Sequence, residues 1–261
     1  MLRQKTVTLW EMTGYAEVIV FIGAGGKTTA LQALAQEIYS QGRRVIGTTT
    51  TKVYPMSSSF WQSWEHPDAP PPQDTETPCF WYKRNGEENK WLGPRVQVVD
   101  QALNGQTKDS GVWLIEGDGA RGRKLKCWNQ HEPQIPLRSQ VAILLISGGL
   151  WGGTLTEEEI HRSELCPELL GGLWTIENAA DYILNSPAFY SEYQELSWIV
   201  LFNIFEDQKS AHSSIEGTGQ ALLKKLEGEM LNPRPSRTRP RHLRLAEGDV
   251  KKGSLTCCDL W

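Results

Sequence analysis

A short apolar run followed by a glycine-rich turn constrains this chain more than any other feature. Residues 18–22 read Val-Ile-Val-Phe-Ile, and residues 23–29 read Gly-Ala-Gly-Gly-Lys-Thr-Thr. The apolar run predicts a buried strand, and the residues that follow the turn have a helical pattern. Glycines let backbone N–H groups converge on an anion, and the positive end of the helix points at the same place. This order predicts a phosphate-binding loop; the alternative is a strand–helix turn that binds nothing.

The loop departs from the common G-x-x-x-x-G-K-[ST] pattern, because Phe21 stands where that pattern has its first glycine. Its compact form resembles the phosphate loops of the Mur-ligase group. Lys27 is predicted to neutralise the β- and γ-phosphates, and the Thr28 hydroxyl is predicted to bind Mg²⁺. The loop residues predicted to bind the nucleotide are Gly23, Gly25, Gly26, Lys27, Thr28 and Thr29.

Composition favours a globular, enzyme-like chain in the cytoplasm. The 261 residues are 39% hydrophobic and 22% charged, which is enough for a sizeable core. The net charge of −4 argues against nucleic-acid binding, and the lack of an 18-residue apolar run argues against a membrane span. The first residues do not resemble a signal peptide. Five scattered cysteines predict reduced thiols without a disulfide framework, and the pair Cys257-Cys258 has no predicted role.

Strand-like and helix-like segments alternate along the chain. Strands are expected over residues 18–22, 43–47, 113–116, 141–146, 198–202 and 242–245. Helices are expected over residues 27–40, 96–103, 156–164, 177–183 and 219–226. This alternation predicts an α/β fold, a three-layer αβα domain like that of phosphate-loop NTPases, with a mostly parallel sheet. Ligands of such sheets bind at the carboxyl ends of the strands.

Residues 55–95 interrupt the alternation. Residues 55–77 are rich in Ser, Pro and Trp and predict a long loop. Residues 79–83 and 90–93 flank an Asn-Gly pair and predict a β-hairpin inserted at the sheet edge. We therefore expect a nucleotide-binding domain over residues 1–230 that contains this insertion. Residues 231–261 are expected to be a C-terminal extension with a last strand and a tail.

A second apolar strand, over residues 112–116, ends in acidic residues. A carboxylate at such a strand tip can hold Mg²⁺ opposite a phosphate loop, and Mg²⁺ needs only one or two protein carboxylates. Asp118 is therefore predicted to bind the metal, and Glu116 is predicted to act in catalysis by orienting water or an acceptor. A polar turn after a strand is the competing interpretation.

Two polar segments are predicted to add to this site. Residues 48–52 read Thr-Thr-Thr-Thr-Lys, and Thr50 and Lys52 are predicted to contact the nucleotide. A Thr-rich strand end is the alternative. Arg121 is predicted to be catalytic by neutralising phosphoryl charge, together with the basic residues at 123, 124 and 126. A solvated basic loop explains these charges equally well.

An ordered series of motifs extends the comparison beyond the loop. Residues 116–121 read E-G-D-G-A-R, residues 125–126 read L-K, and residues 131–136 read H-E-P-Q-I-P. With the loop, the T-T-T-K-V-Y-P run at 49–55 and the pair His161-Arg162, they resemble the signature of the YqeC family of selenium-dependent hydroxylase accessory proteins. The resemblance covers roughly residues 17–207, and the long ordered series makes it specific.

The resemblance implies a nucleotide-binding protein linked with the maturation of selenium-dependent molybdenum hydroxylases, whose partner is such a hydroxylase or its maturation machinery. Relatives often carry an N-K-x-D-like element. Here the corresponding residues begin at Asn203, Ile204 replaces the lysine, and Asp207 lies one place late. This departure favours ATP over GTP as the nucleotide.

The sequence therefore predicts an Mg²⁺-ATP-binding NTPase that assists hydroxylase maturation. An ATP-dependent ligase or kinase acting on a small metabolite stays open as an alternative, as does a nucleotide-dependent scaffold without catalysis. His131 is either an acid–base group or a residue that fixes its loop. His161 is either a family feature or part of a helix-surface charge pair.

Overall fold

The computed structural model describes residues 2–261 except 57–58, 87–88, 106–109, 205–214 and 232–236. The strands are β1 (Gln4–Val7), β2 (Val18–Gly23), β3 (Val45–Thr49), β4 (Lys52–Val53), β5 (Gln62–Glu65), β6 (Cys79–Tyr82), β7 (Arg84–Asn85), β8 (Trp91–Leu92), β9 (Val112–Glu116), β10 (Leu125–Lys126), β11 (Val141–Ser147), β12 (Ile160–His161), β13 (Ser197–Asn203), β14 (His242–Asp249) and β15 (Ser254–Asp259). The helices are α1 (Leu9–Met12), α2 (Lys27–Ser40), α3 (Val96–Asn104), α4 (Ile176–Leu184) and α5 (Ile215–Leu231).

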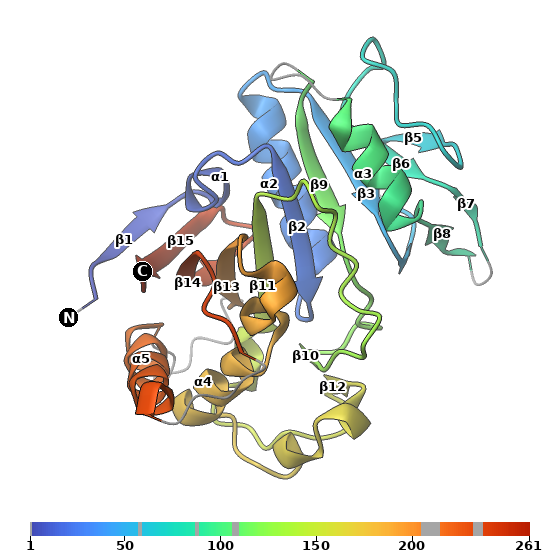
Figure 1. The fold of residues 1–261 in the computed structure, drawn as a ribbon. Coiled ribbons are helices and arrows are strands. Elements are labelled where there is room, and N and C mark those ends of the chain that lie inside the picture. The colour runs from blue at the N-terminus through green and yellow to red at the C-terminus, as the bar shows by residue number, and fades with distance from the viewer. Residues whose placement is uncertain (1, 57–58, 87–88, 106–109, 205–214, 232–236) are drawn as a thin grey trace.

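One large sheet organises the molecule, with the strand order β1-β15-β14-β13-β11-β2-β9-β3-β6-β5 (Figure 1). The strands from β14 to β5 run parallel to their neighbours, whereas β15 and β1 are antiparallel. Inner parallel strands are covered on both faces, which explains the continuous apolar runs of β2, β9 and β11. The chain places β3 and β9 on one side of β2 and β11 on the other, and ligands of open sheets bind near such a reversal.

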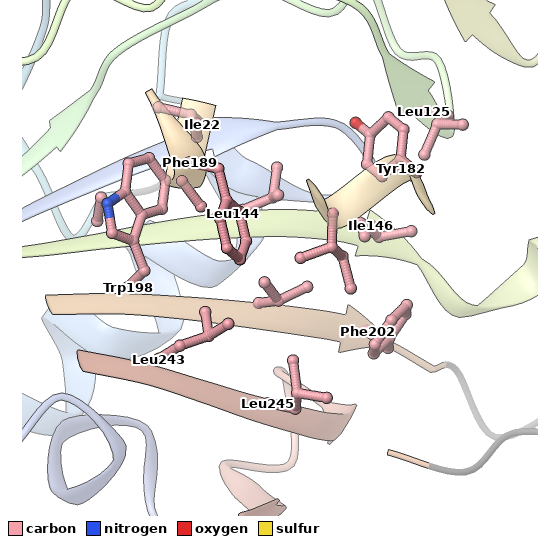
Figure 2. Close-up of a cluster of buried hydrophobic side chains, with 14 of the residues drawn as sticks. Ile22, Leu125, Leu144, Ile146, Tyr182, Phe189, Trp198, Phe202, Leu243 and Leu245 are labelled. Carbon is pink, nitrogen blue, oxygen red and sulfur yellow. The ribbon is translucent and has the colours of Figure 1, made fainter. Parts of the chain in front are cut away.

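Helices cover both faces of this sheet. Helix α2 packs its apolar side with α1 against one face. Helices α3, α4 and α5 contribute to the core on the other face. Figure 2 shows part of this second core, which includes Ile146 of β11, Phe202 of β13 and Tyr182 of α4. The predicted α/β fold with a large, mostly parallel sheet is therefore confirmed, whereas its assignment to the phosphate-loop NTPases stays a prediction.

The helix predicted over residues 156–164 is wrong. Residues 160–161 form β12, which pairs in parallel with β10, and a short 3-10 turn follows at Ser163–Leu165. The backbone carbonyl of Glu159 accepts hydrogen bonds from the N–H groups of Lys124 and Leu125, at 2.9 and 3.0 Å. Tertiary pairing with β10 thus overrides the helical propensity of the local sequence.

The predicted hairpin is only partly present. Strand β6 lies inside the large sheet between β3 and β5, because its Cys-Phe-Trp-Tyr sequence is buried throughout. The antiparallel pair is shorter and joins β7 to β8, which also pairs with β4. Strand β5 lies within the segment predicted to be a loop.

Two strands, β14 and β15, form within the last residues of the chain and belong to the large sheet. Strand β15 pairs antiparallel with both β14 and β1. The division at residue 230 stays a prediction. Every helix in the part of the chain that the structure describes is too short or too polar to cross a bilayer.

Candidate functional site

The loop after β2 lies against the ends of β11 and β13. Gly25 has a φ of +91°, and a Cβ atom there would lie 2.5 Å from the Ser147 nitrogen of β11. Gly26 has a φ of +116°, and a Cβ atom there would lie 2.6 Å from the Asn203 Nδ2 atom of β13. Only glycine combines these dihedral angles with such close approach. Both glycines are therefore needed for the loop to reach the helix at Lys27.

Asn203 fastens the loop from the side. Its Nδ2 group donates to the Gly25 carbonyl at 2.9 Å, and its Oδ1 atom accepts from the Val250 N–H at 3.3 Å. The side chain is fully buried. Sequence reasoning placed Asn203 in a base-recognition element, but its amide is committed to the loop. Asp207 lies outside the described residues.

Lys27 begins α2 and points back along the loop. Its Nζ atom donates to the Gly23 carbonyl at 2.6 Å and lies 3.2 Å from Asp118 Oδ1 and 3.8 Å from Glu116 Oε1. The side chain is only 5% exposed. The structure therefore brings together the lysine and both acidic residues that the sequence singled out.

Thr28 meets Glu116 at the outer side of this cluster. The Thr28 hydroxyl donates to Glu116 Oε2 at 3.0 Å, and Thr28 is exposed. Burial raises the pKa of Glu116, and this effect outweighs the opposing influence of Lys27 and of the Thr28 hydroxyl. Glu116, and not Asp118, is thus the carboxylate that contacts Thr28.

Asp118 occupies the interior of the cluster. Its Oδ2 atom accepts from the Gly23 N–H at 3.0 Å and from the Trp128 indole N–H at 2.7 Å. The Lys126 ammonium lies 3.4 Å from the same atom. Asp118 and Lys126 are both fully buried. The carboxylate thus ties the end of β2 to β10 and compensates two buried cations.

The ionic contacts continue outward from Lys126. Its Nζ atom donates to the Gly119 carbonyl at 2.5 Å and lies 2.9 Å from Glu132 Oε2. Arg162 forms an ion pair with the same Glu132 carboxylate. Arg162 has a φ of +62°, an uncommon conformation that recurs at constrained sites. Charges therefore alternate from Lys27 through Asp118, Lys126 and Glu132 to Arg162.

The remaining predicted residues lie around the cluster. The Thr50 N–H donates to the Glu116 carbonyl at 3.1 Å, and its hydroxyl donates to the Gln134 carbonyl at 2.9 Å. Thr29 is half-buried in the first turn of α2. Lys52 on β4 and Arg121 are exposed, so neither takes part in the buried cluster.

The two histidines differ in environment. His131 is exposed in its loop, and its backbone N–H donates to Asn129 Oδ1 at 2.9 Å. His161 is half-buried on β12. Burial and the charges of Lys126 and Arg162 lower the pKa of His161 to about 4, so its ring is neutral at neutral pH. His161 is therefore unsuited to act as an acid there.

Within the described residues, no group of three or more His, Cys, Asp or Glu side chains is arranged as metal ligands. An open hollow of about 560 Å³ lies by Tyr39, Arg43 and Arg44, and one of about 210 Å³ lies by Glu37 and Val250. Neither hollow is lined by a residue of the Lys27 cluster, which consists of Lys27, Thr28, Glu116, Asp118, Lys126, Glu132 and Arg162.

Cys127 and Cys166 are joined by a disulfide, with their Cα atoms 6.2 Å apart. The expectation that all five cysteines are free thiols is therefore wrong for this pair. The two positions are distant in sequence, and the pairing of β10 with β12 brings them together. Cys79, Cys257 and Cys258 are free and buried.

Comparison with known proteins places this site in a family. A family model described as YqeC protein matches residues 19–164, which is more than half of the chain. The chain belongs to the YqeC family. The "Uncharacterized protein YqeC" of Escherichia coli (strain K12) is 34% identical over 159 residues, which are 59% of this chain. The chain spans 60% of the length of that YqeC relative. No solved structure matches the chain significantly.

The YqeC match contains every residue of the Lys27 cluster but not Asn203. Sequence reasoning missed Trp128 as a partner of Asp118 and Arg162 as a partner of Glu132. It also expected Lys126 to meet an external phosphoryl group, whereas the structure buries it. The L-K, H-E-P and H-R motifs of the YqeC resemblance carry three of these residues, so their order in the sequence was the available signal.

Proposed function

We propose that this protein binds Mg²⁺-ATP at the carboxyl edge of the sheet and hydrolyses it while assisting the maturation of selenium-dependent molybdenum hydroxylases. The carrying observation is the meeting of the loop after β2 with the acidic end of β9. The Thr28 hydroxyl is 3.0 Å from Glu116, and the Lys27 ammonium is 3.2 Å from Asp118. A glycine-rich loop with a lysine, a hydroxyl and carboxylates is suited to bind a phosphate and its metal. The link to the hydroxylases comes from the family resemblance alone.

The oxygen donors of the site fit Mg²⁺, which takes hard ligands and needs only one or two from the protein. Thr28 Oγ1 and Glu116 Oε2 are neighbours, and Thr28 is exposed, so these two would hold the ion. When bound, the metal would neutralise charge on the phosphate oxygens. Asp118 would instead act on Lys27, by fixing where its ammonium points.

The proposal is tested by removing the Lys27 charge. Lys27→Met removes the ammonium and leaves an unbranched side chain of similar length in the buried position. Lys5→Met, at an exposed position on β1, is the matched control. We expect the ATP dissociation constant to rise on the order of 10²-fold in Lys27→Met and to be unchanged in Lys5→Met. Isothermal titration calorimetry measures the affinity, and circular dichroism verifies the fold. Unchanged ATP affinity in folded Lys27→Met would refute the proposal.

Catalysis and base choice need separate measurements. Glu116→Gln should lower Mg²⁺-dependent ATP turnover by roughly 10²-fold, because it removes the carboxylate charge that would hold the ion, while binding without Mg²⁺ is retained. Turnover is measured alone, with an unmatured molybdenum hydroxylase, and with small carboxylate substrates. Stimulation by the hydroxylase supports the accessory role, and rapid turnover with a small substrate supports a ligase or kinase.

ATP should displace GTP in competition, because Ile204 replaces the lysine of the guanine-selecting element.

A further inference from the structure

A basic segment crosses the loop directly. Residues 121–124, Arg-Gly-Arg-Lys, are called the basic strap here. The Gly25 N–H donates to the carbonyl oxygen of Arg123 at 3.2 Å. The Ser147 N–H, at the end of β11, donates to the Lys124 carbonyl at 3.2 Å. The strap is therefore held by backbone contacts at the edge where the phosphate site is proposed.

The contact at Gly25 conflicts with phosphate binding through the same group. In a phosphate-binding loop, the backbone N–H groups between the glycines and the lysine point at the anion. The Gly25 N–H is one of these groups, and it donates to a protein carbonyl. A phosphate oxygen and the Arg123 carbonyl cannot occupy the same position. Binding through this amide thus requires the carbonyl to leave.

The strap is built for such a displacement. Arg121 has a φ of +49° and Gly122 a φ of +73°, and no atom lies within 4 Å of the place where a Gly122 Cβ would be. The turn is closed by the Arg123 N–H, which donates to the Ala120 carbonyl at 3.0 Å. Lys124 is held independently, because its Nζ atom lies 3.1 Å from Glu159 Oε1. Residues 121–123 thus form an exposed turn with free space beside it, and residue 124 is held by contacts of its own.

The charge of the strap suits the ligand that would displace it. Arg121 and Arg123 are exposed, and Arg123 donates to the backbone carbonyl of Glu158, an uncharged partner. An arginine released from such a contact gains a charge-assisted bidentate contact on a phosphate. Loss of the carbonyl contact is thereby offset by contacts to the displacing anion.

We propose that the basic strap is a phosphate-recognition element, in which a nucleotide phosphate replaces the Arg123 carbonyl at the Gly25 N–H and Arg121 and Arg123 bind the phosphates. This inference rests on the proposed ATP binding. It gives Arg121 and Arg123, which the sequence predicted to neutralise phosphoryl charge, a defined position at the loop, and it adds a local rearrangement. The chemical class recognised is a polyphosphate.

The rearrangement is measured by NMR with ¹³C-labelled backbone carbonyls of Arg123 and Lys124. At saturating Mg²⁺-ATP, the Arg123 carbonyl shift should change because it loses the Gly25 donor. The Lys124 carbonyl, held by Ser147, is the internal control and should change less. Inorganic pyrophosphate should cause the same Arg123 change, because it carries the polyphosphate without the base.

Affinity provides the second measurement. Arg121→Gln/Arg123→Gln should raise the ATP dissociation constant roughly tenfold. Arg3→Gln/Lys5→Gln removes the same charge from exposed positions at the far edge of the sheet and should change it less than about twofold. The proposed role of the basic strap is wrong if the Arg123 carbonyl shift stays constant at ATP saturation. It is also wrong if the two double variants bind ATP with equal affinity. If Lys27→Met still loses ATP binding in that case, the proposed function stands without it. Failure of the wild type to bind ATP overturns both.

Discussion

The two carboxylates at the end of β9, Glu116 and Asp118, are only two residues apart and both lie near Lys27, yet their other partners differ. Asp118 is fully buried and contacts Lys27, Lys126, Trp128 and the Gly23 N–H. Glu116 is also buried, but one of its oxygens accepts a hydrogen bond from the hydroxyl of Thr28, a residue that is exposed. The interior of the cluster is a closed network of paired charges, and its outer side reaches solvent.

This difference assigns separate tasks to the two sides. Removing one partner of a buried ion pair is costly because it leaves an uncompensated charge in the interior. A ligand that needed an Asp118 oxygen would have to break such pairs. A ligand at Thr28 and Glu116 would replace one part-buried hydroxyl–carboxylate hydrogen bond and would leave the ion pairs of Asp118 in place. We therefore expect Asp118 substitutions to affect folding first and Glu116 substitutions to affect ligand chemistry first.

The strongest test of the comparison is Asp118→Asn. The amide keeps the size of the side chain but removes the charge that compensates Lys27 and Lys126, so we expect a loss of about 3–5 kcal/mol of unfolding free energy. Asp68→Asn, at an exposed position, should stay within about 0.5 kcal/mol of the wild type. Urea unfolding measures both variants. Equal stability of the two variants would show that the contacts of Asp118 do not stabilise the fold.

The disulfide between Cys127 and Cys166 adjoins the buried contacts of Asp118. Cys127 lies between Lys126 and Trp128 in the sequence, and both of these residues contact Asp118. Cys127→Ser/Cys166→Ser should lose about 2–4 kcal/mol of unfolding free energy, because the bond closes a loop with a sequence separation of 39. A thiol reductant should destabilise the wild type but not the double variant. Thiol titration of the unfolded protein should find the three free cysteines before reduction and all five afterwards. Five thiols before reduction would contradict the pairing.

On the outer side, Glu116 makes stability depend on pH. Its pKa is raised in the folded protein, so the folded state binds a proton more readily than the unfolded state. Above both pKa values, the folded state bears the full cost of the buried charge. As the pH falls through the folded-state pKa, protonation relieves this cost, and stability rises relative to Glu116→Gln. Thermal unfolding of the two proteins, followed as the pH is lowered from neutral toward the ordinary pKa of a carboxyl group, measures the difference. Parallel pH profiles would mean that burial does not shift Glu116.

The fold was predictable for strands and helices whose type can be recognised from the pattern of their own residues. Continuous apolar runs predicted the buried strands β2, β9 and β11, and helical spacing predicted α2. These predictions needed no knowledge of the neighbouring strands. The helix predicted over residues 156–164 is wrong because residues 160–161 form β12, whose pairing partner β10 is distant in the sequence. Strand β6 was placed in a hairpin because Asn-Gly is a strong local signal, while its position between β3 and β5 is a tertiary property.

The candidate site shows the same division. Lys27, Thr28, Glu116 and Asp118 were singled out together, because the loop and the acidic strand end each have a recognisable local pattern. Their mutual distances did not follow from those patterns. The contact of Thr28 with Glu116 depends on the pairing of β2 with β9, and the burial of Asp118 with Lys126 depends on where β10 lies. The hydrogen bond between Asn203 and Gly25 joins positions 178 residues apart, which no local pattern predicts.

Lys52 provides the smallest expected effect and tests how far the outer side extends. The sequence placed it with Thr50 in the nucleotide site, but Lys52 is exposed on β4, which pairs with β8 outside the large sheet. Thr50 instead contacts the Glu116 carbonyl through its backbone. We therefore expect Lys52→Gln to change the unfolding free energy by less than about 0.5 kcal/mol and the ATP dissociation constant by less than about threefold. Thr50→Val, which removes the hydroxyl bonded to Gln134, should have the larger effect on stability. Calorimetric titration and urea unfolding of both variants measure this order. If Lys52→Gln weakened ATP binding as much as Lys27→Met, the nucleotide site would extend to β4, and the limit drawn around Thr28 and Glu116 would be wrong.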